Sequence, residues 1–328
     1  MKAVGISRYG DASVLERWEI AVPEPGPGEV LVEVRFAGVN FMDVHTRQGK
    51  YATSTTYPVR LPVTLGMEGA GIVVGRGDGV EEFALGERVA WCLSWGSYAQ
   101  YQVVPATRLA RVPDELGLDM AAASLFQGCT AHYLVHDVAH LGPGSTCLVH
   151  AASGAIGQLL IQMAIGRGSR VVATTSSATK AALARSLGAE AVFDYGEGRF
   201  ADDVLAATGG RGVDVTFDAV GVSTLRASMR ATRTRGLLVN YGAVAGPVHD
   251  LDPLELGEAG SLFFTRPRLA DYIATGEEMR RRGAEVFDGI VRGEWRVQIS
   301  AACTLDDVDQ AMADLEGRRQ IGKTVVTI

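Results

Sequence analysis

The stretch STCLVHAASGAIGQLLIQMAI, at residues 145–165, decides the fold that we expect for this chain. Residues 145–151 form a short, uncharged and mostly apolar run that predicts a buried strand. The small residues at 152–157 then predict a tight turn, and residues 158–165 have the apolar periodicity of a helix. A second apolar run, at 170–174, predicts another strand. The order of strand, turn, helix and strand is that of a βαβ unit.

The turn at residues 152–157 matches a dinucleotide-binding fingerprint in which Ala152 stands at the position of the first glycine. Such a turn needs small residues because its backbone approaches a pyrophosphate closely while the helix packs against the strand. The helix N-terminus then offers N–H groups and a partial positive charge to the phosphates. A tight turn in another kind of α/β domain is the alternative interpretation. The expected cofactor-binding residues of the turn are Ser153, Gly154, Ala155, Ile156 and Gly157.

The end of the second strand indicates which dinucleotide is bound. An NAD-preferring fold places Asp or Glu about 20 residues further on, where the carboxylate holds the ribose 2′-hydroxyl. Residues 173–177 read ATTSS and contain no acid, and Lys180, one of four lysines in the chain, follows. Hydroxyl groups and a cation suit a 2′-phosphate, so we expect NADPH, with Thr174, Ser176 and Lys180 among the residues that bind it. The alternative for Lys180 is an ordinary solvated side chain on the next helix.

The composition is that of a globular α/β enzyme. The chain has 328 residues, of which 47% are hydrophobic and 40 are glycine, and this length suggests two domains or one large one. A net charge of −7 argues against nucleic acid or an anionic membrane as a partner. We find no signal-peptide pattern and no apolar run long enough to span a membrane, so we expect a cytoplasmic protein with a small-molecule substrate.

Two different patterns divide the chain. Up to about residue 120, short alternating runs such as 31–36, 71–74 and 88–91 predict strands of a mostly β, partly closed barrel. Beyond it, two helices are expected at 119–125 and 130–138. After the central unit, helices at 180–187, 202–208 and 225–233 alternate with strands at 191–194, 213–218 and 236–240. This alternation predicts an α/β fold with a doubly wound parallel sheet. From about residue 270, two amphipathic helices and a strand at 324–328 should return to the N-terminal domain.

Several motifs along the chain together resemble those of one family. They are GVNFMD at 38–43, RQG at 47–49, GMEGAG at 66–71, GSYA at 96–99, QGCTA at 127–131 and SLFFTRP at 261–267. With the turn at 152–157, they resemble the zinc-free quinone oxidoreductases of the medium-chain dehydrogenase/reductase superfamily over nearly the whole chain. The segment at 51–63 departs from that family by being longer.

The resemblance implies two domains with the active site in the cleft between them. A GroES-like catalytic domain would comprise residues 1–121 and 270–328, and a Rossmann domain at 122–269 would bind NADPH. Asn40 and Tyr51 match positions near the nicotinamide and are the expected catalytic residues. The remaining expected cofactor-binding residues are Thr130 at a helix start, Tyr195 beside the adenosine, Tyr241 and Gly242 at a strand end, and Lys323.

The zinc ligands of the related alcohol dehydrogenases have no counterpart here. Those enzymes carry a cysteine near the position of Asn40 and a histidine at the position of Met67, so we expect no metal, and we interpret Glu68 as a structural carboxylate. Three histidines, at 132, 136 and 140, recur at helical spacing. On a straight helix they would span about 12 Å, too far for a single ion. We interpret them as a packed or solvated helix face.

These observations favour an NADPH-dependent, metal-independent reductase of a quinone or an α,β-unsaturated carbonyl compound. Reduction places negative charge on a carbonyl oxygen, and the Tyr51 hydroxyl, the Asn40 amide or a water could donate to it. A biosynthetic enoyl reductase that acts on a carrier-bound thioester is one alternative. A non-catalytic NADPH-binding protein is another. The apolar strand expected at 262–264, beyond the last strand of the sheet, predicts a homodimer.

Overall fold

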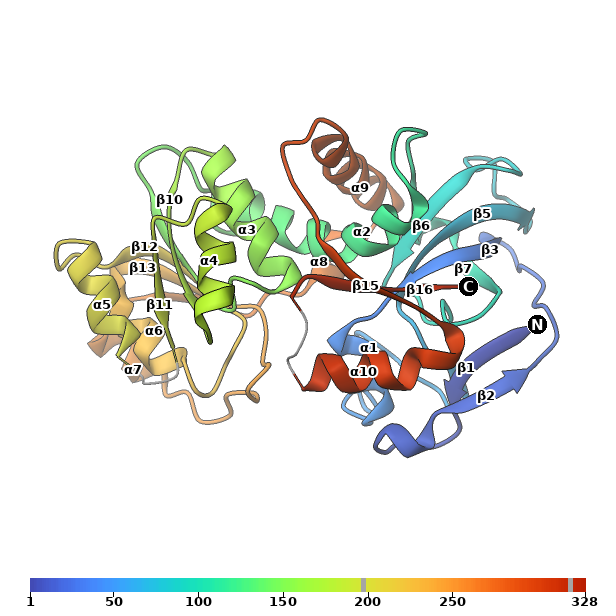
Figure 1. The fold of residues 1–328 in the computed structure, drawn as a ribbon, viewed down its shortest axis with the longest axis horizontal. Helices are drawn as coiled ribbons and strands as arrows, with labels where there is room; N and C mark the ends of the chain where they lie inside the picture. Colours follow the sequence, from blue (N-terminus) through green and yellow to red (C-terminus); the bar gives the residue numbers. More distant parts are fainter. Residues whose placement is uncertain (196–198, 318–320) are drawn as a thin grey trace. The chain divides into compact units, whose positions relative to one another are not determined.

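The computed structural model describes residues 1–195, 199–317 and 321–328 (Figure 1). The chain divides into two compact units. Unit 1 comprises Met1–Cys129 and Tyr272–Ile328, and unit 2 comprises Thr130–Asp271. In the described part of the chain, no helix is both long and apolar enough to cross a membrane.

Unit 1 is built mainly from strands. One sheet has the order β15-β16-β3-β5-β6-β8, with β7 pairing to β3, and a smaller sheet has the order β2-β1-β4. The strands are β1 (Lys2–Ile6), β2 (Glu16–Glu19), β3 (Glu29–Gly38), β4 (Val63–Thr64), β5 (Glu68–Arg76), β6 (Arg88–Cys92), β7 (Tyr101–Pro105), β8 (Leu109–Arg111), β15 (Ile299–Thr304) and β16 (Lys323–Thr327). The helices include α1 (Phe41–Arg47), α9 (Gly276–Val291) and α10 (Val308–Glu316).

The C-terminal strand completes the larger sheet of unit 1. β16 lies antiparallel to β3, with Val325 opposite Gly38, and parallel to β15. The expected return of the chain to the N-terminal part is therefore observed within this unit. An apolar core lies between the smaller sheet, α1 and α10, and includes Ile6, Leu65, Tyr98, Met312 and Val326.

Unit 2 contains a parallel sheet with the order β11-β10-β9-β12-β13-β14. Its strands are β9 (Thr146–Val149), β10 (Arg170–Thr175), β11 (Ala191–Asp194), β12 (Val213–Asp218), β13 (Thr232–Asn240) and β14 (Phe263–Thr265). The connecting helices are α3 (Ala155–Gly166), α4 (Ala178–Ser186), α5 (Phe200–Ala207), α6 (Leu225–Ala231) and α7 (Pro253–Glu258). The chain runs outward from β9 to β11 and then from β12 to β14. The order therefore reverses between β9 and β12, where ligands bind in sheets of this type.

The expected fold class is confirmed: a doubly wound parallel sheet is combined with a mostly β, GroES-like part whose sheet is not a closed barrel. Two expected element boundaries were wrong. The helices expected at 119–125 and 130–138 form one α-helix, α2 (Leu118–Tyr133), which continues as a π-helix at Leu134–Val138. Gly128 does not interrupt it, because a Cβ there would lie 2.4 Å from Val286 Cγ1, so the glycine provides space for α9. Helix α6 ends at Ala231, and β13 begins at Thr232.

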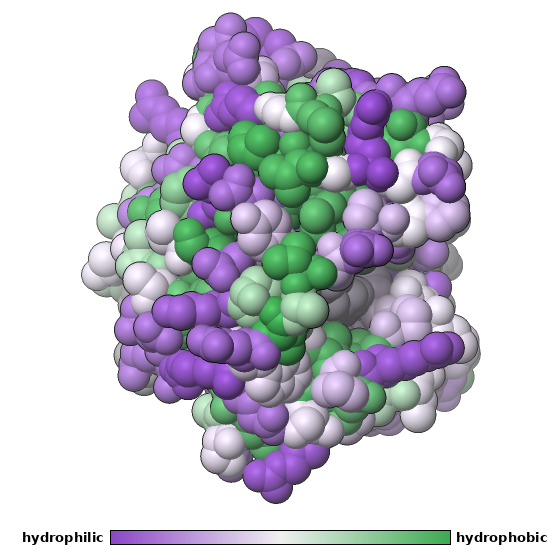
Figure 2. Space-filling view, turned by 90° about the vertical axis from the view of Figure 1, so that its right-hand side faces the viewer, coloured by the Kyte–Doolittle hydropathy of each residue, from purple (hydrophilic) through white to green (hydrophobic). Residues whose placement is uncertain are grey.

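The surface of the molecule is mixed in polarity. On the face shown in Figure 2, hydrophobic residues gather toward the middle and hydrophilic residues interrupt and surround them. Exposed large apolar side chains occur in both units, including Leu85 at 62% and Phe263 at 65% of their full exposure. Single exposed apolar residues are normal on protein surfaces, but Phe263 lies on the edge strand β14, where main-chain groups also need partners.

Candidate active site

The turn between β9 and α3 lies at the point where the order of the sheet in unit 2 reverses. The His150 N–H donates to Phe217 O of β12 at 3.1 Å, and the Ala152 N–H donates to Thr174 O of β10 at 3.1 Å. The turn is thus held by the main chains of both neighbouring strands. Because the sheet is parallel, this edge collects the carboxyl ends of its strands, where dinucleotides bind in folds of this kind.

The expected fingerprint residues surround the start of α3. A Cβ on Gly157 would lie 2.5 Å from Ala151 O and 2.8 Å from Ala152 Cα, so only glycine allows the helix to approach the turn this closely. Gly154 is the N-cap residue and provides no side-chain cap to the helix. The first N–H groups of α3, at Ala155 and Ile156, therefore lie where an anion would be bound. Ser153 completes the turn, and its carbonyl accepts from Gln158 Nε2 at 2.8 Å.

Two of the residues expected at a 2′-phosphate lie together at the end of β10. Lys180 Nζ donates to Ser176 Oγ at 3.4 Å, and Ser177 caps α4 by accepting from the Lys180 N–H. Ser176 is exposed and Lys180 is half-buried. Thr174 differs from them because its hydroxyl is fully buried and lies 2.6 Å from His150 Nδ1. Tyr195, at the end of the neighbouring strand β11, donates its N–H to Thr175 O at 3.4 Å.

The end of β13 brings further expected residues to the same edge of unit 2. The Tyr241 N–H donates to Asp218 O of β12 at 3.0 Å. A Cβ on Gly242 would lie 2.6 Å from Ala219 O, so this position also requires glycine. Burial raises the pKa of the Tyr241 hydroxyl well above its usual range. Thr130, expected at a helix start, instead lies inside α2 and is buried, because α2 is one continuous helix.

Asn40 belongs to a buried polar cluster in unit 1. Its amide nitrogen donates to Gly38 O at 3.1 Å and to Glu68 Oε2 at 3.0 Å, and it lies 3.4 Å from Met67 Sδ. Both amide hydrogens thus have partners within the protein. Glu68 also accepts from the Phe126 N–H at 2.7 Å, as expected for a structural carboxylate.

Lys323 places its ammonium group in this same cluster. Its Nζ lies 2.7 Å from Glu68 Oε2 and 2.7 Å from Asn40 Oδ1, and the residue is 2% exposed. A Cβ on Gly38 would collide with Glu68 Oε2 at 2.6 Å and with Lys323 Cε at 2.9 Å, so Gly38 makes room for the ion pair. The expected contact of Lys323 with the cofactor stays a prediction. What the structure shows is a buried ion pair beside Asn40.

Asp43 is a buried carboxyl group beside this cluster that the sequence did not single out. It accepts from the Asn40 N–H at 2.9 Å, from the Met67 N–H at 3.0 Å and from the Tyr98 hydroxyl at 2.9 Å. Burial raises its pKa to about 7 although these donors act in the opposite direction. Its three donors connect the start of α1 with the residue that precedes β5 and with Tyr98 of the core.

Tyr51 follows α1 and lies in a row of half-buried aromatic side chains. Its ring centroid lies 6.1 Å from that of His45 and 5.5 Å from that of Tyr57, and Tyr57 lies 6.3 Å from Trp95. Burial, followed by the charge of Lys50, lowers the pKa of His45 to about 4, so this imidazole is neutral near neutral pH. Tyr57 belongs to the segment at 51–63 that departs from the family pattern, and it extends the aromatic row toward Trp95.

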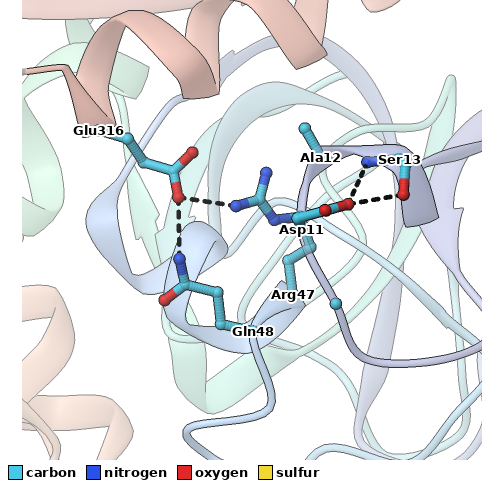
Figure 3. Close-up of a pocket in the computed structure, with 7 residues that line it drawn as sticks. Asp11, Ala12, Ser13, Arg47, Gln48 and Glu316 are labelled. Atoms are coloured by element: carbon cyan, nitrogen blue, oxygen red, sulfur yellow. Dashed lines mark hydrogen bonds and ion pairs between the residues drawn. The ribbon is translucent and has the colours of Figure 1, made fainter.

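One open cavity of unit 1 is lined by none of the expected site residues. It has a volume of about 590 Å³ and is lined by Gly10, Asp11, Ala12, Ser13, Arg47, Gln48 and Glu316 (Figure 3). Arg47 donates to Glu316 at 2.7 Å, and Gln48 donates to the same carboxylate at 2.9 Å. Arg47 Nε and Nη1 have no partner, but both atoms are buried and cannot be reached from the cavity. The lining thus combines the carboxylates of Asp11 and Glu316 with small and uncharged polar residues.

Several functional candidates were missed from the sequence. His150 was read as part of a strand, Asp43 as part of a motif, and Tyr57 as part of an atypical segment. The strand-end position of His150 and the helix-start position of Asp43 were signals, but the side-chain partners of His150 and two of the three donors to Asp43 lie far away in sequence. Among the described residues, no group of three or more His, Cys, Asp and Glu side chains could hold a metal ion. The rings of His132 and His136 pack against each other with centroids 4.2 Å apart.

Comparisons with known proteins agree with this arrangement. Residues 26–114 match the family described as alcohol dehydrogenase GroES-like domain, and residues 155–285 match the family described as zinc-binding dehydrogenase. A quinone oxidoreductase of Pseudomonas aeruginosa is 37% identical, with 99% of each chain covered. A 2-haloacrylate reductase of a Burkholderia species is 36% identical and covers 94% of this chain and 93% of its own. The crystal structure of Escherichia coli quinone oxidoreductase complexed with NADPH is similar at a TM-score of 0.95, with 32% identity and 100% of both chains covered.

A Rossmann sheet in the same chain as a GroES-like unit defines a medium-chain dehydrogenase/reductase. Within that superfamily, the chain belongs to the quinone oxidoreductase family. Members of this family are NADPH-dependent oxidoreductases, which confirms the cofactor and the class of enzyme expected from the sequence.

The ion pair of Lys323 and Glu68 predicts a large effect on stability. Lys323→Met should lower the free energy of unfolding by about 3–5 kcal/mol, because it leaves a carboxylate buried without its cation. Adding Glu68→Gln should restore much of this loss, since the amide keeps an acceptor for the Phe126 N–H. Urea unfolding of the three proteins measures both effects. Arg292→Met, which removes an exposed ion pair with Glu294, is the control and should change little. A loss of less than about 1 kcal/mol for Lys323→Met would contradict the importance of the pair.

Proposed function

We propose that this protein uses NADPH to reduce quinones or α,β-unsaturated carbonyl compounds, without a metal ion. The observation that carries the proposal is the turn at 152–157, whose close packing requires Gly157 and whose helix start lacks a side-chain cap. The names of the relatives support the same class of acceptor, since they include both quinone oxidoreductases and a 2-haloacrylate reductase. A haloacrylate is itself an α,β-unsaturated carbonyl compound.

We assign the cofactor to unit 2 and the chemistry of the acceptor to unit 1. In terms of the domains expected from the sequence, residues 122–269 bind NADPH, and residues 1–121 with 270–328 form the catalytic domain. The α3 N-terminus, with Ser153 and Gly154, would hold the pyrophosphate. Ser176 and Lys180 would bind the 2′-phosphate, Tyr195 would flank the adenosine, and Tyr241 and Gly242 would pass beneath the nicotinamide. When bound, NADPH supplies the hydride.

Tyr51 is the better candidate for the hydrogen-bond donor to the acceptor. Reduction of an enone moves an electron pair onto the carbonyl oxygen, and a positioned donor stabilises this charge. Both amide hydrogens of Asn40 are already bonded to Gly38 O and Glu68. We therefore propose that Asn40 acts by holding the buried cluster, whereas the phenol of Tyr51 acts on the acceptor. The proton that completes the product can come from solvent.

The chemistry of the cluster supports the proposed metal independence. Asn40 and Met67 occupy the positions of a cysteine and a histidine in the zinc enzymes, and neither an amide nor a thioether is a usual zinc ligand. The Lys323 ammonium, 2.7 Å from both Asn40 and Glu68, already provides a positive charge there. A second cation in this buried space would be repelled by it.

The proposed activity predicts NADPH oxidation with a panel of small quinones and enones, at a rate that dialysis against a chelator does not change. Tyr51→Phe should lower kcat by about 10²–10³ with an enone, because one donor to the developing oxyanion is lost. The measurement is steady-state NADPH consumption, with NADPH affinity determined separately. Cofactor binding without turnover of any acceptor would favour a non-catalytic NADPH-binding protein. Turnover only of carrier-bound thioesters would favour a biosynthetic enoyl reductase. Unchanged kcat in Tyr51→Phe would remove this hydroxyl from the mechanism.

Ser176 and Lys180, at the end of β10, predict a preference for NADPH over NADH. Lys180→Ala should weaken NADPH binding about tenfold or more and leave NADH binding nearly unchanged, because only NADPH carries the 2′-phosphate. Fluorescence titration of both cofactors measures this difference. Equal affinity of the unmodified protein for the two cofactors would contradict the assignment of Ser176 and Lys180.

The edge of the sheet in unit 2 supports the proposed homodimer. β14 is the terminal strand of the sheet, and Phe263 on it is 65% exposed. The outer edge of β14 and this apolar side chain could therefore pair with a second copy of the protein. Light scattering should give a dimer at micromolar concentration, and Phe263→Lys should give a monomer. Leu85→Lys, at a similarly exposed residue of unit 1, should leave the dimer intact. A monomeric unmodified protein would refute this proposal.

A further inference from the structure

A continuous chain of hydrogen bonds crosses the sheet of unit 2 beneath the cofactor turn. Thr174 Oγ1 lies 2.6 Å from His150 Nδ1, and His150 Nε2 lies 2.9 Å from Ser228 Oγ. Ser228 Oγ donates in turn to Asp218 Oδ2 at 2.9 Å. All four residues are completely buried. The chain therefore connects the ends of β10, β9 and β12 with helix α6.

The direction of these hydrogen bonds determines the form of the imidazole. The Ser228 hydroxyl uses its hydrogen on the Asp218 carboxylate, so it can only accept from His150 Nε2–H. Nδ1 is then the unprotonated nitrogen and accepts from the Thr174 hydroxyl. Burial lowers the pKa of His150, which favours this neutral form, while the Asp218 charge acts in the opposite direction. The edge of the Phe200 ring packs against the imidazole at a centroid distance of 4.8 Å.

The Asp218 carboxylate also accepts hydrogen bonds from groups other than Ser228. It accepts from the Val220 N–H at 2.8 Å, from the Gly221 N–H at 2.9 Å and from the Thr224 hydroxyl at 2.8 Å. The carboxylate would thus keep several donors without His150. In this series of hydrogen bonds, the imidazole of His150 connects Ser228 with Thr174. Its absence would leave the Thr174 hydroxyl buried without this partner.

The residue that follows His150 has an unusual backbone conformation. Ala151 has φ of 50°, in the left-handed region that a residue with a Cβ adopts at a cost. The Ala151 carbonyl is the group that Gly157 approaches, and it accepts from the Gly154 N–H at 2.9 Å. The strained residue thus sets the shape of the turn. Such a conformation persists only where the surroundings hold it in place.

We propose that His150 is a positioning residue for the cofactor: it anchors the end of β9 to β10 and α6, and so holds Ala151 in the strained conformation that shapes the phosphate-binding turn. The proposal rests on the proposed binding of NADPH at this turn. In this proposal, His150 does not itself touch the cofactor. It acts through the geometry of Ala151 and Gly154.

The test compares NADPH affinities, measured by fluorescence titration, for His150→Leu and for the same variant carrying Ala151→Gly. We expect His150→Leu to weaken binding about tenfold or more, and the added Ala151→Gly to restore it to within about threefold of the unmodified protein, because glycine adopts positive φ without strain. A role of His150 in stability alone would not be rescued by a change in backbone freedom. Failure of the rescue, or unchanged affinity in His150→Leu, would overturn the proposal.

A matched control separates this effect from a general loss of stability. Thr216→Val removes another buried hydroxyl from the same sheet, one that bonds to Thr232 at 2.7 Å and makes no hydrogen bond to His150 or Thr174. It should lower Tm while leaving NADPH affinity within about twofold. Equal weakening by Thr216→Val and His150→Leu would overturn the proposal.

A second variant covers the case in which His150→Leu does not fold. Ser228→Ala keeps the imidazole and removes the acceptor of its Nε2–H, and it should weaken NADPH binding about threefold or more. Affinity equal to that of the unmodified protein would overturn the anchoring role. An unmodified protein that binds no NADPH would instead refute the proposed function itself, so the two failures are distinguishable.

Discussion

The close approach of Gly157 to the backbone of Ala151 and Ala152 is the contact on which the proposed cofactor site depends. Because no Cβ separates them, α3 begins close to the end of β9, and its first N–H groups are free of a side-chain cap where we propose that the phosphates bind. The neighbouring strands hold the turn through main-chain bonds to Phe217 and Thr174. The site is therefore a property of the sheet and the helix packed on it, and few side chains need to touch the pyrophosphate.

In unit 1, a buried ion pair of Lys323 and Glu68 organises the polar cluster around Asn40. Lys323 comes from the C-terminal strand, and Glu68 and Asn40 come from the N-terminal part, so the pair also joins the two ends of the unit. A desolvated ion pair is costly unless its remaining groups are bonded, and here Glu68 also accepts from Phe126 and Asn40. These buried charges thus contribute to the integrity of unit 1.

Local patterns in the sequence predicted most of the fold but few of the contacts at the site. The turn at 152–157 and the alternating strands and helices after it were recognisable because each depends on residues near one another in sequence. The C-terminal strand was recognisable as a strand, although its partner β3 lies far away in the sequence. The single helix α2 was not recognised as continuous, and Gly128 within it leaves space for Val286 of α9. The partners of His150 lie 24 and 78 residues away, and Lys323 lies 283 residues from Asn40. Such pairs exist only once the fold has formed, so neither periodicity nor spacing could reveal them.

The central claim is that this protein transfers a hydride directly from NADPH to an acceptor carbon. The most direct measurement is a single turnover with an enone and NADPH that carries deuterium at the transferable position, followed by analysis of the product. The account predicts deuterium on the carbon β to the carbonyl, a solvent-derived hydrogen on the α carbon, and a slower turnover than with unlabelled NADPH. A reduced product without deuterium, or no reduction of any enone or quinone by a protein that binds NADPH, would contradict it.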